Sequence, residues 1–131
     1  MSKIIHLEDS EDFRNKVKNS LISIPGLSVK QYNDFGSFVN SNYPDYEADL
    51  FILDRHFPDS SGELGDNLWK AAKHISFLNQ NNQIIVLTHS PPSESDWRKF
   101  PCIREVFNKY DFNPEMFKER VSEYLEMGGR K

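Results

Sequence analysis

Short apolar runs alternate with amphipathic segments along the whole chain, and the pattern predicts five strands and five helices. Three strand candidates are almost continuously apolar, which is typical of strands buried on both faces: 3–7, 49–53 and 83–87. Residues 27–32 alternate apolar and polar side chains, which indicates a strand with one exposed side. Residues 103–107 are the fifth candidate.

Segments with apolar residues at helical spacing lie between and after these strands. Ser10 is suited to cap the first helix, and Pro25-Gly26 to end it. Asn113 followed by Pro114 is a strong start for the last helix. The other helices are predicted at 35–39, from Leu64 to Leu78, and, weakly, at 93–100; loops are predicted at 40–47 and 57–62.

Regular alternation of strands and helices predicts an α/β fold of the (βα)5 type. Such a fold has a doubly wound parallel sheet with helices on both faces and right-handed crossovers. No break in composition indicates a second domain, so one domain is expected over residues 1–131. Its core is expected at about 3–126, with 127–131 as a tail or the start of a linker.

Composition and charge narrow the classes of function. The chain has 16 Lys and Arg against 20 Asp and Glu, and because no basic block stands out, direct binding to nucleic acid is not expected. The single cysteine, Cys102, excludes an internal disulfide and fits a reducing compartment. The apolar runs are too short for a membrane span, and the start turns polar too quickly for a signal peptide. A cytoplasmic protein without membrane contact is therefore expected.

Polar side chains stand at the carboxyl ends of four predicted strands. Glu8 and Asp9 follow the first, Asp54 the third and Thr88 the fourth, and Lys109 comes just after the fifth. Taken alone, each has a simpler explanation, such as a helix cap, a turn or a surface lysine. Because all parallel strands end on the same edge, the topology gathers them where open α/β sheets bind ligands.

Three acids at one edge repel one another and need a cation. An open site with oxygen ligands and room for water suits Mg²⁺. Asp54 could then act as a nucleophile toward phosphorus, which would give an aspartyl phosphate. Mg²⁺ and the lysine would neutralise the phosphoryl oxygens, and the hydroxyl of Thr88 could donate a hydrogen bond to one of them.

The acid pair Glu8-Asp9, the strand 50–54, the loop 58–62, Leu87-Thr88 and Lys109 together resemble the receiver domain of two-component response regulators, over about residues 3–126. The resemblance implies a flavodoxin-like sheet of strand order 2-1-3-4-5, with Asp54 as the phosphoacceptor. It also implies Mg²⁺ ligation by Asp9, Asp54, Glu8 through water and the backbone carbonyl of His56, and phosphoryl binding by Thr88 and Lys109.

By the same resemblance, a sensor histidine kinase or a phosphotransfer domain supplies the phosphoryl group. The chain would catalyse only its own phosphorylation and dephosphorylation, so it is not expected to be an enzyme with a separate substrate. It would signal through a changed protein-binding surface. The downstream protein or output domain, and whether the chain forms a homodimer, stay open.

The sequence departs from the family pattern at four places. Tyr110 follows Lys109, where the family usually has a proline with a cis peptide bond. Val106 occupies the position of the aromatic switch residue, while the adjacent Phe107 is expected to face the other side of the sheet. His89 follows Thr88, where a small residue is usual. The segment from Asp54 to Thr88 is also long, with the surplus expected in 62–66 or 79–82.

Two histidines are expected to modify the site. His89 should project beside the phosphoryl pocket and exclude the water that would hydrolyse an aspartyl phosphate, although an imidazole could instead position that water. His56 could narrow the same entrance from the opposite side.

The main alternative is a pseudo-receiver, a protein-binding module that keeps the fold without phosphorylation. A phosphatase of the haloacid type would need a second aspartate two positions after Asp54, where His56 stands. A flavodoxin-type nucleotide binder would need a phosphate-binding loop after the first strand, and none is present there.

Overall fold

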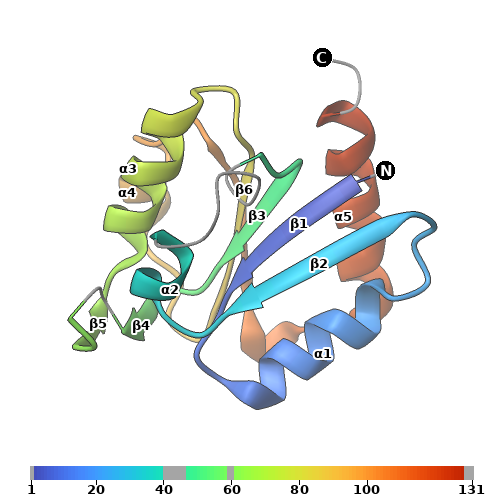
Figure 1. The fold of residues 1–131 in the computed structure, drawn as a ribbon, viewed down its shortest axis with the longest axis horizontal. Helices are drawn as coiled ribbons and strands as arrows, with labels where there is room; N and C mark the ends of the chain where they lie inside the picture. Colours follow the sequence, from blue (N-terminus) through green and yellow to red (C-terminus); the bar gives the residue numbers. More distant parts are fainter. Residues whose placement is uncertain (1, 40–46, 59–60, 129–131) are drawn as a thin grey trace.

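The computed structural model describes residues 2–39, 47–58 and 61–128, and these form one parallel five-stranded sheet with helices on both faces (Figure 1). The strand order is β2-β1-β3-β6-β7, which is the predicted order 2-1-3-4-5 once only the strands of this sheet are counted. Its strands are β1 (Ser2–Leu7), β2 (Leu27–Tyr32), β3 (Leu50–Leu53), β6 (Ile84–Thr88) and β7 (Ile103–Asn108).

Helices α1 (Glu11–Leu21) and α5 (Pro114–Gly128) cover one face of the sheet. Helices α2 (Phe35–Val39), α3 (Leu68–Leu78) and α4 (Glu94–Trp97) cover the other. Within the described ranges, every helix is too short or too polar to cross a lipid bilayer.

The central strand β3 contributes side chains to both halves of the core. Leu50 and Ile52 pack toward α1 and α5, whereas Phe51 and Leu53 pack toward α2 and α3. All four side chains are almost completely buried, as the continuous apolar run predicts for a parallel strand covered on both faces. The strand that leads into Asp54 is therefore held rigidly from two sides.

Capping residues mark the starts of α1 and α5, and a glycine marks the turn after α1. The side chain of Ser10 accepts a hydrogen bond from the backbone N–H of Phe13 at 3.3 Å, which satisfies one free donor at the start of α1. Asn113 accepts from the N–H of Met116 at 3.0 Å and does the same for α5. Gly26 has a φ of 70°, which glycine adopts without strain, and turns the chain from α1 into β2.

The segment between β3 and α3 contradicts the predicted start of the third helix and the first two residues of the predicted loop. It was expected to be a loop at 57–62 followed by a helix from Leu64, but β4 (His56–Pro58) and β5 (Leu64–Asp66) form a two-stranded antiparallel hairpin, and α3 begins only at Leu68. Leu64 is 64% exposed and is not part of α3. It matched the helical pattern because it stands four residues before Leu68. The hairpin includes one of the two segments where surplus length was expected.

Other boundaries differ slightly from expectation. Helix α4 is shorter than the predicted 93–100, and a short 3-10 helix follows β7 at Lys109–Asp111. Helix α5 continues through Gly128, so residues 127 and 128 are helical and not part of a tail. The predicted loop at 40–47 lies almost entirely outside the described residues, as do 129–131.

Candidate functional site

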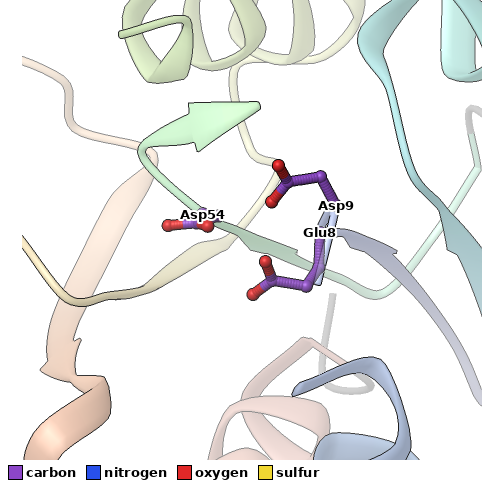
Figure 2. A group of neighbouring side chains, drawn as sticks. All are labelled: Glu8, Asp9 and Asp54. Atoms are coloured by element: carbon purple, nitrogen blue, oxygen red, sulfur yellow. The ribbon is translucent and has the colours of Figure 1, made fainter. Parts of the chain in front are cut away.

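Three carboxylates converge at the carboxyl edge of the sheet. Strands β1 and β3 are neighbours with Leu7 opposite Leu53, so the residues that follow them are brought side by side. One carboxylate oxygen from each of Glu8, Asp9 and Asp54 lies within 4.8 Å of the others (Figure 2). Glu8 and Asp54 are buried, while Asp9 is exposed. The cluster therefore has a closed floor and an open, solvent-facing side.

Lys109 supplies a buried positive charge to this cluster. Its Nζ lies 2.6 Å from Oε1 of Glu8 and 3.1 Å from Oδ2 of Asp54, and its side chain is only 3% exposed. The same ammonium lies 4.6 Å from the ring centroid of Phe13 in α1, a cation–π contact. Lys109 is thus a fixed part of the site and not a solvated surface lysine.

Burial and crowding of charge change the ionisation of two side chains. Burial, and after it the charge of Asp54, raises the pKa of Glu8 to about 8, although Lys109 acts in the opposite direction. Burial, and after it the charge of Lys109, lowers the pKa of His6 to about 3. His6 is therefore neutral near pH 7. With a pKa of about 8, Glu8 holds a proton at pH 7, which shows that the site favours additional positive charge.

A chain of hydrogen bonds fixes the position of Glu8. Arg14 donates from Nη1 to the Glu8 carbonyl at 2.9 Å, and the N–H of Ser10 donates to Oε2 of Glu8 at 3.2 Å. Gln31 in β2 donates to the Arg14 carbonyl at 2.7 Å, and its Nε2 lies 3.1 Å from Nδ1 of His6. Strand β2, helix α1 and the acid pair are thereby joined.

Thr88 lies at the end of strand β6, and His56 lies at the start of strand β4. Thr88 is the last residue of β6, the neighbour of β3, and is buried, with its Oγ1 accepting a hydrogen bond from the N–H of Ser90 at 3.2 Å. His56 begins β4, two residues after Asp54, and its side chain is exposed. Thr88 belongs to the same sheet edge as Asp54, while His56 begins the hairpin.

The ring of His89 lies against two aromatic rings. Its centroid is 5.4 Å from that of Phe13 and 4.6 Å from that of Tyr110. Because Phe13 also contacts the Lys109 ammonium, these rings form one side of the site. The sequence drew attention to His89, but it did not indicate that Phe13 and Tyr110 would hold it.

The switch positions have the predicted orientation. Val106 packs on the side of the sheet covered by α2 and α3, whereas Phe107 packs on the other side, with its ring centroid 5.4 Å from that of Phe117. The peptide bond between Lys109 and Tyr110 is trans, and every peptide bond in the described ranges is trans.

Comparison with known proteins connects this geometry to a family. No protein-family model matches the chain, and no curated protein matches it. Solved structures do: the BeF3-activated receiver domain of DrrB is 26% identical, with a TM-score of 0.74, over 96% of this chain and 98% of that one. The chain has the fold of a response-regulator receiver domain.

Two further structures support this assignment of the receiver fold. The non-phosphorylated HemR receiver domain of Leptospira biflexa is 21% identical, with a TM-score of 0.76, over 95% of this chain and 94% of its own. The response regulator TrrA of Thermotoga maritima, in complex with Mg²⁺-BeF, is 24% identical, with a TM-score of 0.73, over 95% and 99%. The resemblance recognised in the sequence is thus confirmed for the fold.

One residue of the site was missed at the level of sequence. Arg55, directly after Asp54, donates its backbone N–H to Oδ1 of Asp54 at 2.6 Å. Its side chain is directed to two other segments, β5 and the loop after β6. An arginine after a strand-end aspartate carries no periodic or motif signal, so only the three-dimensional structure identifies it.

Proposed function

We propose that the chain is a phosphorylatable receiver domain in which Asp54 accepts a phosphoryl group. The proposal rests on one observation. Asp54 lies close to two further acids, Glu8 and Asp9, and to Lys109, at one edge of a receiver fold. The receiver domain of DrrB, which matches over nearly its full length, is activated by BeF3.

The residues of the site suit a hard divalent cation. Glu8, Asp9 and Asp54 offer carboxylate oxygens within reach of one ion, and the exposure of Asp9 leaves space for coordinating water. When bound, Mg²⁺ would neutralise charge on the phosphoryl oxygens. The backbone carbonyl of His56 is proposed as a further ligand, and Glu8 is proposed to act through water. TrrA, a structural neighbour, is in complex with Mg²⁺.

The chain's own residues would divide the work of phosphoryl transfer. One oxygen of Asp54 attacks phosphorus, an O–P bond forms, and the bond from phosphorus to a histidine nitrogen of the donor breaks, with its electron pair remaining on that nitrogen. The ammonium of Lys109, already 3.1 Å from Asp54, would shift to the phosphoryl oxygens. The hydroxyl of Thr88, which accepts from Ser90, would also donate a hydrogen bond to another phosphoryl oxygen.

The donor is proposed to be a sensor histidine kinase or a phosphotransfer domain. The chain would act as a signalling component that modifies only itself, and its output would be a changed protein-binding surface. The intracellular side of a two-component system is the place where such a donor operates, which agrees with the cytoplasmic location expected from the sequence.

Beryllofluoride binding tests the proposal, because this group stands in for the phosphoryl group on an aspartate. Titrating beryllofluoride with Mg²⁺ should shift the amide NMR signals of Asp54, Arg55 and Thr88, and the shifts should be absent without Mg²⁺. Asp54→Asn keeps the size of the side chain and serves as the control. Equal shifts in the variant, or none in the wild type, would contradict the proposal.

A phosphorylation-independent binding module is the second candidate. The observation in its favour is the position of Phe107, which is packed against Phe117, while Val106 occupies the switch position. A receiver arranged in this way lacks the usual aromatic side chain for reporting phosphorylation. Failure of beryllofluoride to bind would favour this candidate.

A further inference from the structure

Arg55 connects three segments around the candidate site. Its Nε and Nη2 both contact Oδ2 of Asp66, at 3.1 and 3.0 Å, and its Nη1 donates to the backbone carbonyl of Ser90 at 3.0 Å. Its backbone N–H donates to Asp54. One residue therefore links the end of β3, the strand β5 and the loop after β6.

Arg55 and Asp66 form a partly exposed ion pair through two N–H groups of the guanidinium. The side chains of Arg55 and Asp66 are 26% and 34% exposed, so water screens the pair only partly. Two N–H groups of one guanidinium point at a single carboxylate oxygen, which orients the side chain as well as attracting it. A guanidinium held in this way can keep its remaining N–H aimed at Ser90.

Further bonds attach the β4–β5 hairpin to the strand end. The carbonyl of Arg55 accepts from the N–H groups of Asn67 and Leu68, at 3.0 and 3.2 Å. The buried side chain of Asn67 donates to the carbonyl of Phe57 at 2.6 Å and closes the hairpin from inside. These hydrogen bonds attach the hairpin to the chain around Arg55, at the base of the site.

We call Arg55 with its bonds to Asp66 and Ser90 the clasp. Its Ser90 end lies on a segment with a proposed role at Asp54. Ser90, whose carbonyl accepts from Arg55, donates its own N–H to Oγ1 of Thr88. His89 lies between them in the chain. The Arg55–Ser90 bond thus restrains the segment that contains Thr88 and His89, the two residues with proposed roles at the phosphoryl group.

We propose that Arg55 is a positioning residue that holds the Thr88–Ser90 segment and the β4–β5 hairpin in fixed relation to Asp54. The link to phosphoryl transfer rests on the proposed function. A change in the hairpin, through Asp66, would reach Thr88 by way of one guanidinium. A partner that contacts the hairpin could thereby alter the rate of phosphorylation without touching Asp54.

A coupling experiment tests the clasp without any phosphorylation. Asp66→Asn should shift the amide NMR signals of His89 and Ser90, because Arg55 bonds both Asp66 and Ser90. In an Arg55→Met background, the same substitution should leave these signals unchanged. No shift from Asp66→Asn when Arg55 is intact, or an equal shift in both backgrounds, would overturn the proposal.

The functional consequence is measured separately, as the rate of labelling by acetyl phosphate with Mg²⁺. Loosening the segment that carries Thr88 should slow labelling about threefold to tenfold in Arg55→Met, and in the same direction in Asp66→Asn. Arg120→Met is the matched control, because Arg120 forms a comparably exposed pair with Glu105 on β7 and α5. Its labelling rate should equal that of the wild type.

The two proposals fail in distinguishable ways. If the wild type is labelled and both clasp variants match its rate, the positioning role is wrong while the proposed function stands. If the wild type is not labelled at all, the proposed function is wrong, and the amide shifts still decide whether the clasp exists. Should Arg55→Met fold poorly, Asp66→Asn retains Arg55 and gives the same comparison.

Discussion

At the scale of single residues, the position of Lys109 shows how the site is organised. A lysine beside two buried acids is costly to bury unless it is paired, and here Nζ contacts both Glu8 and Asp54. Asp9 differs from these two acids. It is exposed, and in the described part of the chain Lys109 does not contact it within 4 Å. Asp9 is therefore the carboxylate most available to a cation from solvent.

We expect Asp9→Asn to weaken Mg²⁺ binding on the order of tenfold, because one negative charge and one strong oxygen ligand are lost. Isothermal titration calorimetry with MgCl₂ measures the change directly. Asp12→Asn is the matched control, since Asp12 is also exposed but pairs with Lys16 and does not belong to the cluster. An unchanged affinity in Asp9→Asn would exclude the metal-binding role of Asp9.

The second residue-scale prediction concerns His89. Its ring fills the space between Phe13 and Tyr110 beside the site, so we expect it to exclude water from an aspartyl phosphate at Asp54. His89→Ala should then release phosphate a few-fold faster from purified phosphoprotein with excess Mg²⁺. A slower release would mean that the imidazole positions the water instead.

The sequence predicted the acids, Thr88 and Lys109 because strand ends in a parallel sheet are gathered by topology. It could not predict the contacts of Arg55 or the packing of His89, because those depend on a hairpin and on ring positions that leave no repeating pattern. Phe13 lies on the buried face of α1, and its ring also contacts Lys109.

At the scale of elements, a side-chain cap stabilises the start of the last helix, next to the site. Helix α5 starts just after the short 3-10 helix that begins at Lys109, and the side chain of Asn113 caps α5. We expect Asn113→Ala to lower the free energy of unfolding by about 1 kcal/mol, since a free N–H at the helix start loses its acceptor. Asn113→Asp should retain the stability of the wild type. Urea unfolding followed by circular dichroism measures both, and equal values for Ala and Asp would contradict the capping role.

Strands β1, β3 and β6 were predictable because each is an apolar run of the length a buried strand needs, and β2 because its apolar and polar side chains alternate. The β4–β5 hairpin was not, since its strands have three residues each and its centre carries the Pro, Asp, Ser and Gly typical of a loop. Helix α4 was predicted too long because its charged sequence has no clear apolar stripe, and none of its residues is buried.

At the scale of the whole molecule, the site couples metal binding to folding. Glu8 and Asp54 follow the paired strands β1 and β3, and Lys109 follows β7, so the contacts of Lys109 with both acids form only when these parts of the sheet are folded together. A cation that binds this cluster binds the folded state and stabilises it by mass action.

We therefore expect Mg²⁺ at tenfold excess over its dissociation constant to stabilise the protein by about 1.4 kcal/mol. The thermal midpoint in a calorimetric scan should rise by a few degrees, and EDTA should reverse the change. Asp9→Asn should show a smaller shift at the same concentration. A rise of equal size with Ca²⁺-free, Mg²⁺-free NaCl of matched ionic strength would show general screening and not site binding.

The central claim is that Asp54 accepts a phosphoryl group, and labelling by acetyl phosphate tests it most directly. Intact mass spectrometry should show one added phosphoryl group on the wild type with Mg²⁺, little with EDTA, and none on Asp54→Asn under either condition. Peptide mapping should locate the group on the peptide that contains Asp54. Equal labelling of Asp54→Asn, or a complete lack of labelling of the folded wild type with Mg²⁺, would contradict the account.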